Sequence, residues 1–261
     1  MNNLTPVVRT LLVINVILFA CQIFLEINFP YLLGLRYFTA ESFAPYQILT
    51  YMFIHSNLLH LFSNMLGLFM FGSLLESTLG PKKFLWLYLI AGLGAGVLHF
   101  GINALEIYQQ EQAMQSYFAT PNPDSFELYM KNYEPQQWQK ISPEWFNSFI
   151  DHPKDPTIIT TSKEAIGELF QYRLNIPMVG ASGAVFGLLA AFAMIFPNLE
   201  IFLLFIPFPI KAKYFIPLYV CYELYAGLYY PNSSNIAHFA HVSGALVGFL
   251  LIKYWKIPRR Y

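Results

Sequence analysis

The stretch Gly180-Ala181-Ser182-Gly183-Ala184-Val185-Phe186-Gly187 places one serine among small residues at the start of an apolar segment. Small residues around Ser182 let neighbouring helices and an extended peptide approach closely, and the spacing of Gly183 and Gly187 is typical of a close helix contact. A serine at a helix N-terminus also lies near free backbone N–H groups that can bind an oxyanion. Alone, the stretch fits a plain packing face equally well, because a serine nucleophile needs a base.

The composition of the whole chain indicates a membrane protein. Only 11% of the 261 residues are charged, against about 25% in a soluble domain, and 56% are apolar. The balance of 15 basic and 15 acidic residues argues against a nucleic-acid-binding surface. We expect an all-α polytopic membrane protein with six transmembrane helices. The apolar segments that predict them are Val7 to Ile27, Leu58 to Leu75, Phe84 to Ala104, Ala181 to Pro197, Tyr214 to Leu228 and Ala237 to Trp255.

The short connections between these segments predict how the chain is oriented in the membrane, because Lys and Arg are concentrated in cytoplasmic loops. The opposite short loops contain only Arg36. We therefore expect both termini to be cytoplasmic, and the absence of a targeting peptide favours a bacterial inner membrane. The basic residues of the cytoplasmic side are Lys82, Lys83, Lys211, Lys213, Lys253, Lys256, Arg259 and Arg260, joined by Arg9.

The polar stretch 102–178, between the third and fourth segments, is predicted to be an extracytoplasmic insertion within a single membrane domain of residues 1–261. It carries ten acidic and five basic residues, and its many aromatic residues are not typical of a disordered tether. We expect a small helical appendage. Helix starts are predicted at Asp124 and Thr161, each with a glutamate three residues later, and at Ser142, which precedes a proline.

Polar residues inside apolar segments are functional candidates, and two further clusters qualify. His60 and Asn64, at the outer end of the second segment, are four residues apart and share one face of a helix. His241, at the start of the sixth segment, begins on the same outer side as Ser182 and can accept its proton. Glu223, the acidic residue well inside the last three segments, is interpreted as a structural polar contact.

Three motifs in register resemble those of the rhomboid family of intramembrane serine proteases: H-x4-H-x3-N from His55 to Asn64, GASG from Gly180 to Gly183, and AHxxG from Ala240 to Gly244. The resemblance covers all six segments. It implies a six-helix rhomboid-like bundle with Ser182 as nucleophile, His241 as general base, and His60 and Asn64 as donors to the oxyanion.

The resemblance also implies the substrates of the protein. These are membrane proteins with a transmembrane helix, cleaved by a Ser-His dyad within the lipid bilayer near the outer membrane boundary. Neither a metal ion nor an organic cofactor is implied. The chain departs from the family pattern in two places. Some members have a tyrosine where this chain has Phe186, which keeps an aromatic face but lacks a hydroxyl, and compact bacterial members have a much shorter stretch between the third and fourth segments.

Three other functions remain open. The first is an inactive relative that binds membrane helices, although Ser182 and His241 are both present. The second is a channel or transporter with a histidine proton relay, for which the sequence offers no evident paired intramembrane carboxylate. The third is a metal site of His55, His60 and His241, although no HExxH motif is present.

Overall fold

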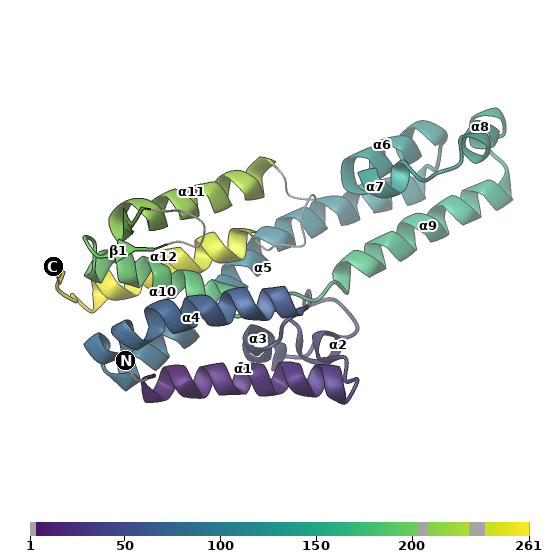
Figure 1. Ribbon diagram of the computed structural model, residues 1–261. Coiled ribbons are helices and arrows are strands. Elements are labelled where there is room, and N and C mark those ends of the chain that lie inside the picture. The colour runs from purple at the N-terminus through teal and green to yellow at the C-terminus, as the bar shows by residue number, and fades with distance from the viewer. Residues whose placement is uncertain (1–3, 203–207, 230–237, 261) are drawn as a thin grey trace. The chain divides into compact units, whose positions relative to one another are not determined.

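The computed structural model describes residues 4–202, 208–229 and 238–260, which form two compact units. The first unit, which we call the bundle, comprises Met1–Leu35, Ala44–Gly101 and Pro177–Tyr261. The second unit, which we call the appendage, comprises Arg36–Phe43 and Ile102–Ile176. Figure 1 shows that both units consist mainly of helices.

Helices occupy all six predicted apolar segments, so the all-α fold is confirmed. Among the described residues, α1, α4 and α5 are long and apolar enough to span a membrane, and α10 is a shorter apolar helix. Ala237, the first residue of the sixth segment, lies outside the described residues. The six helices are α1 (Pro6–Phe24), α4 (Leu58–Leu79), α5 (Pro81–Ala119), α10 (Ser182–Ile195), α11 (Ala212–Tyr229) and α12 (His238–Tyr254).

Helix α5 is longer than predicted, because it continues past Ala104 to Ala119. The residues that follow Ala104 contain no proline or glycine and include Leu, Glu, Gln, Ala and Met, which all favour helix. The apolar segment therefore ends at a change of polarity, whereas the backbone keeps its helical conformation.

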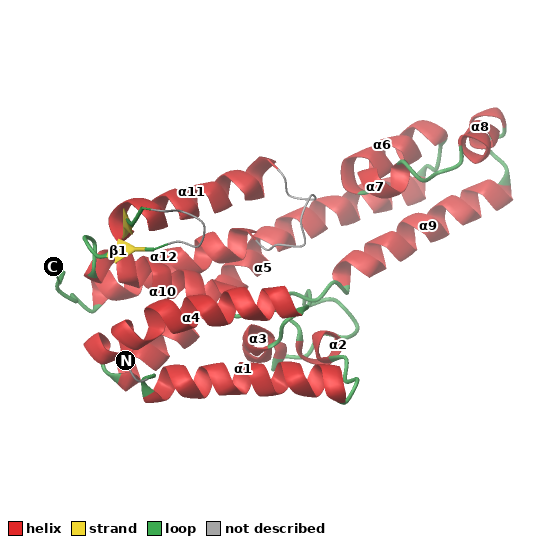
Figure 2. Cartoon of the chain, in the orientation of Figure 1, coloured by secondary structure: helices red, strands yellow, loops and turns green. Residues whose placement is uncertain are grey.

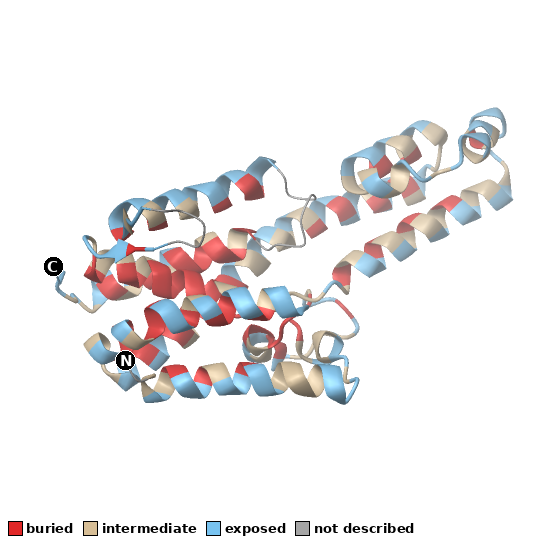
Figure 3. Cartoon of the chain, viewed as in Figure 1, coloured by how far each residue is buried: buried red, intermediate tan, exposed pale blue. Residues whose placement is uncertain are grey.

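Helix α10 packs against α4, α11 and α12, and small residues set how closely these neighbours approach. A Cβ atom added to Gly244 of α12 would lie 2.0 Å from the carbonyl oxygen of Gly183, and one added to Gly248 would lie 2.3 Å from that of Gly187. On α5, the Ala95 methyl group would lie 2.4 Å from a Cβ atom at Gly183. The predicted small-residue contact is confirmed, and most of α10 is buried (Figure 3).

Short helices fill the connection between α1 and α4: α2 (Phe29–Leu33), α3 (Gln47–Thr50) and the 3-10 turn η1 (Tyr51–Phe53). The buried Tyr51 donates its hydroxyl to the Gly92 carbonyl of α5 at 2.6 Å. Its own carbonyl accepts the Gly180 N–H at 2.9 Å. These bonds connect the turn before α4 to the segment that precedes Ser182.

The far end of α4 carries a second set of contacts. The Glu76 carboxylate accepts the Thr5 hydroxyl at 2.5 Å and the Val8 N–H at 2.9 Å, and so caps the N-terminus of α1. Between α10 and α11, β1 (Glu200–Ile201) and β2 (Ile210–Lys211) form a two-stranded antiparallel sheet (Figure 2). These contacts close the end of the bundle that lies away from His60.

The appendage contains the second part of α5 together with α6 (Pro123–Tyr133), α7 (Pro135–Trp138), α8 (Pro143–Asp151) and α9 (Pro156–Leu174). The predicted start at Ser142 is confirmed, since its hydroxyl accepts the Trp145 N–H at 3.3 Å. The other two predicted starts are wrong. Asn122 caps α6 in place of Asp124, and Thr161 lies inside α9, which Asp155 caps. A proline follows each true cap, and proline favours the first position of a helix.

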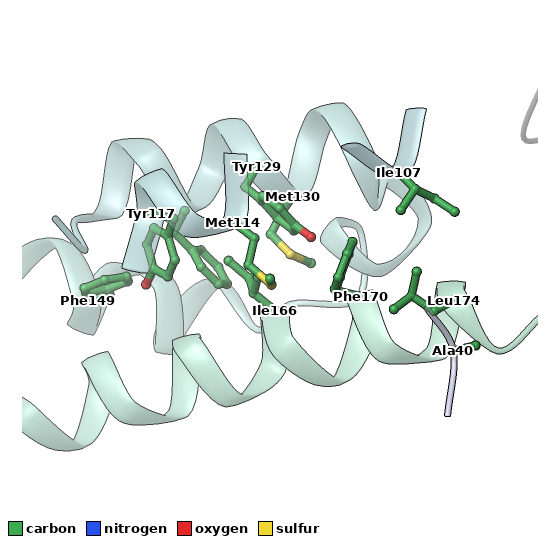
Figure 4. Packing of buried hydrophobic residues seen from close by; sticks show 11 residues of the cluster. Ala40, Ile107, Met114, Tyr117, Tyr129, Met130, Phe149, Ile166, Phe170 and Leu174 are labelled. Carbon is green, nitrogen blue, oxygen red and sulfur yellow. The ribbon is translucent and has the colours of Figure 1, made fainter. Parts of the chain in front are cut away.

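Aromatic and aliphatic side chains together form the core of the appendage (Figure 4). Phe126 and Phe149 are buried, with ring centroids 6.0 Å apart. Residues 36–43 belong to this unit, because Arg36 Nε and the Ser42 hydroxyl both donate to Asn175, at 3.0 Å and 2.6 Å. The predicted helical appendage is confirmed as packed structure. Its extracytoplasmic location remains a prediction.

Candidate active site

Ser182 is the first residue of α10, and Gly180 shapes the backbone that leads to it. Gly180 has a φ of 122°, which residues with a side chain rarely adopt. Its N–H is held by the Tyr51 carbonyl. The first N–H groups of a helix have no partner inside it. The start of α10 therefore presents backbone donors beside the serine hydroxyl.

His241 comes from α12, and its ring lies on the face of Phe186. The two rings are stacked, with centroids 4.4 Å apart and an interplanar angle of 7°. Because Phe186 follows Ser182 by four residues, both side chains lie on one face of α10. The stack holds the imidazole over the face of the helix that carries the serine, and Phe186 provides the aromatic face that the sequence predicts.

The hydrogen bonds found among the described residues do not include one between Ser182 and His241. The contact between a nucleophile and its base is often long in a free enzyme and shortens when substrate binds. The structure thus brings the two helices together at the serine, as predicted, without a direct bond between the two side chains.

His60 and Asn64 of α4 approach the backbone at Gly180. A Cβ atom added to Gly180 would lie 2.5 Å from His60 Nε2 and 3.7 Å from Asn64 Nδ2. Asn64 Nδ2 is buried and has no hydrogen-bond partner among the described residues. Buried polar atoms without a partner are uncommon and call for an explanation. Both side chains thus place a nitrogen within reach of the residues just before Ser182.

Local bonds orient the His60 ring. Asn57 caps α4 by accepting the His60 N–H at 2.9 Å. On the ring, Nδ1 lies 3.1 Å from the Ser56 hydroxyl and accepts the Ser56 N–H at 3.5 Å. Since a backbone N–H can only donate, Nδ1 is the acceptor and Nε2 carries the hydrogen. His55 packs edge-on against the ring, at 5.1 Å between centroids. His60 therefore presents an N–H donor towards Gly180.

Glu223 of α11 belongs to this site, although its sequence position did not indicate so. Its Oε2 lies 2.8 Å from Nδ1 of His241 and 2.7 Å from Nδ1 of His238, and all three residues are buried. The sequence indicated only weakly that Glu223 lies at this site. His238 and His241 are three residues apart and share a helix face, and Glu223 is the acidic residue of the preceding apolar segment.

These three residues are also a group that could bind a metal ion. Among the described residues, the possible ligand atoms of Glu223, His238 and His241 all lie within 4.8 Å of one another. Among the residues that the structure describes, the alternative set of His55, His60 and His241 is not found as such a group. The Glu223 oxygen already accepts from both imidazoles, so hydrogen bonding accounts for the arrangement without an ion.

Comparison with known proteins gives two matches. A family model described as the Rhomboid domain matches residues 42–108 and 157–256. The residues between these two ranges, 109–156, all lie in the appendage. The chain is also 30% identical over 216 residues to an uncharacterized mitochondrial rhomboid protein of Schizosaccharomyces pombe. That alignment covers 78% of this chain and 50% of the yeast protein, so the chain spans about half the length of this curated relative.

Proposed function

This chain belongs to the rhomboid family and is an integral membrane protein, and from that premise we propose that it is an intramembrane serine endopeptidase with Ser182 as nucleophile and His241 as base. The observation that carries the proposal is the stack of the His241 ring on Phe186, one helical turn from Ser182. The close contact of Gly183 with Gly244 supports it, because it brings the two helices together beside these residues.

In the proposed reaction, Ser182 Oγ attacks the carbonyl carbon of the scissile peptide bond while its proton passes to Nε2 of His241. The C–N bond then breaks, and the departing amine takes that proton, which leaves an acyl-enzyme ester on Ser182. Water, deprotonated by the same imidazole, hydrolyses the ester and returns the serine hydroxyl. No cofactor takes part in these steps.

The tetrahedral intermediates carry a negative oxygen, and we assign its stabilisation to His60, Asn64 and the Ser182 N–H. His60 has its hydrogen on Nε2, and the Asn64 amide nitrogen has no hydrogen-bond partner among the described residues. Donors that are in place before the reaction contribute more than donors that must reorganise. An oxyanion would satisfy the buried Asn64 donor for the duration of the step.

The proposed substrates are membrane proteins whose transmembrane helix is cleaved near the outer membrane boundary. A helix keeps its carbonyl groups in hydrogen bonds, so the cleaved segment must unwind before the serine can attack. Glycine and serine favour cleavage because they weaken a helix, and alanine favours cleavage because its small side chain leaves space for the approach of the serine.

We further propose that both termini face the cytoplasm of a bacterial cell, with the appendage on the opposite face of the inner membrane. The Arg260 N–H donates to the Ile195 carbonyl at 2.6 Å, so the basic C-terminal segment lies against the end of α10 opposite Ser182. Figure 1 places the labels N, C and β1 at that same end of the bundle. This grouping of basic segments supports the orientation.

Serine-directed labelling tests the proposed function. We expect a fluorophosphonate to label the detergent-solubilised protein at Ser182 and the protein to cleave a transmembrane reporter. Ser182→Ala and His241→Ala should abolish both activities and leave the thermal transition in place. Ser73→Ala, which changes a serine further along α4, is the matched control and should behave as the natural protein does. Undiminished cleavage by Ser182→Ala would disprove the proposal.

A proton-conducting channel is the second candidate, because the structure contains the paired carboxylate that such a relay requires, Glu223 with His238 and His241. Reconstituted vesicles with a pH-sensitive dye distinguish the two functions. The channel requires proton flux that survives Ser182→Ala, whereas the protease requires cleavage that does not.

A further inference from the structure

Glu223 of α11 contacts the imidazole of His241, the proposed base. Its carboxylate and the two imidazoles are all buried, with side-chain exposures of 5% for Glu223, 9% for His238 and 11% for His241. One oxygen, Oε2, contacts Nδ1 of both rings. The ring atom of His241 that the proposed reaction uses, Nε2, is on the opposite side of the imidazole from this contact.

The contact determines which nitrogen of His241 carries the hydrogen. An ionised carboxylate can only accept hydrogen bonds, so Nδ1 of His241 must be the donor. A neutral imidazole with its hydrogen on Nδ1 has its lone pair on Nε2, which is the form a base requires. Phe186 fixes the plane of the ring by stacking, and Glu223 fixes the rotation of the ring within that plane.

We propose that Glu223 is a positioning residue of the protease, which orients His241 and stabilises its imidazolium when the Ser182 proton arrives. The inference rests on the proposed function. His238 donates to the same oxygen and so holds the carboxylate in place. The His241–Glu223 pair then corresponds to the histidine-acid half of a serine-histidine-acid triad, with the acid supplied by a neighbouring helix, and Ser182 joins it when substrate binds.

A metal ion held by the same three residues would require different chemistry. Nδ1 of each ring would then be a ligand without a hydrogen, and removal of the ion would abolish the activity. The short distances between the Glu223 oxygen and both nitrogens favour the hydrogen-bonded arrangement, because each ring has a single hydrogen that the carboxylate can accept.

The test compares Glu223→Gln with Glu223→Asp in the full chain. Glutamine keeps the shape but can turn its amide nitrogen towards His241, which would then hold the wrong tautomer. We expect kcat to fall about 10²- to 10⁴-fold, at the upper end the effect of replacing the acid of a serine-protease triad by its amide. The KM and the thermal transition should change little. Aspartate restores the carboxylate, so kcat should recover at least about tenfold relative to glutamine.

Glu76→Gln is the matched control, because it removes another buried carboxylate of the bundle at the far end of α4, about 24 Å along the helix from His60. It should lower the thermal transition, since Glu76 caps α1, and leave kcat unchanged. A folded Glu223→Gln variant with natural kcat would overturn the inference, as would a Glu223→Asp variant no better than glutamine.

Two further results would have a different meaning from those of the Glu223 variants. Loss of activity in EDTA with recovery on adding Zn²⁺ would overturn the inference in favour of a metal site. If the natural protein neither labels at Ser182 nor cleaves the reporter, the proposed function itself has failed. The Glu223 variants are therefore measured against a natural protein whose activity has been demonstrated.

Discussion

At the scale of single residues, the proposed role of Asn64 as an oxyanion donor rests on the surroundings of its side chain. Its amide nitrogen is buried in the bundle without a hydrogen-bond partner among the described residues. Leaving such a donor unsatisfied costs roughly 1–3 kcal/mol. A residue retained for stability alone would be expected to have its donor satisfied, whereas a donor reserved for a transient oxyanion is unsatisfied in the free enzyme.

Replacing Asn64 with alanine should therefore separate activity from stability. We expect Asn64→Ala to lower kcat about 10²- to 10³-fold, the usual effect of removing one oxyanion donor. The thermal transition should stay the same or rise, because a buried unsatisfied group is removed. Reporter cleavage and thermal unfolding in detergent measure the two quantities. A variant that loses stability but keeps its kcat would show that Asn64 contributes to packing and not to the reaction.

At the scale of elements, side-chain hydrogen bonds and close packing of small residues hold the helices of the bundle together. Glu76 of α4 caps α1, and Tyr51 of η1 joins α5 to the segment before α10. Glycine and alanine faces then allow α10, α12 and α5 to approach closely. Precise contact between neighbouring helices places Ser182 and His241 on facing surfaces, since each helix carries only part of the site.

The junction of α6 and α7 in the appendage has a titratable group with a consequence for stability. Burial raises the pKa of the Glu134 carboxyl above its usual range, while the Gln110 amide, 3.4 Å away, and the Arg173 charge oppose that rise. The folded appendage thus binds the proton more tightly than the unfolded chain does. Its contribution to stability is present below the ordinary glutamate pKa of about 4.3 and declines as the pH rises through the raised value.

We expect the appendage to open more readily as the pH rises from about 4.3 towards neutrality, and Glu134→Gln to reduce this dependence. Glutamine has no charge to desolvate and keeps an oxygen that can accept from Gln110. Hydrogen exchange of peptides from residues 123–151, corrected for the intrinsic effect of pH, measures the opening. The same pH slope in the natural protein and the variant would show that Glu134 does not contribute.

At the scale of the whole molecule, the proposed catalytic residues and the insertion lie in different units. Ser182, His241, His60 and Asn64 all lie in the bundle, and the family match omits residues 109–156 of the appendage. The stretch 102–178 has twice as many acidic as basic residues and supplies most of a hydrophobic core that is separate from the bundle. We therefore expect the appendage to influence which proteins reach the site without taking part in the reaction.

A deletion tests whether the appendage affects the choice of substrate without taking part in the reaction. Replacing Glu111 to Glu168 with a short Gly/Ser linker retains the Arg173–Glu106 ion pair, 2.8 Å long, where α5 and α9 lie side by side. It also retains the bonds from Arg36 and Ser42 to Asn175. The shortened protein should still be labelled by a fluorophosphonate at Ser182, while its cleavage of substrates with large outer domains should change.

The thermal transition must first show that the shortened protein is folded. A folded deletion that is no longer labelled would show that the appendage helps to form the active site. Labelling with an unaltered preference among substrates would instead remove its proposed role in selection.

Several features of this protein follow from its sequence alone. The lengths of six apolar segments predict six helices, because a chain in hydrocarbon must satisfy its backbone hydrogen bonds internally. The motif spacings, with the family resemblance, predict Ser182, His241, His60 and Asn64. Capping-box spacing was a poor guide in the appendage, where Asn122 and Asp155, each followed by a proline, cap α6 and α9 in place of the predicted Asp124 and Thr161.

Only the tertiary structure decided which side chains meet across helices. The bond between Glu223 and His241 depends on how α11 and α12 are rotated about their axes, and neither rotation can be read from spacing within one helix. The same holds for residues 36–43, which join the appendage through Asn175, and for Glu76, which caps a helix some 70 residues earlier in the chain. Periodicity within a helix determines which residues share a face, whereas packing between helices determines what that face contacts.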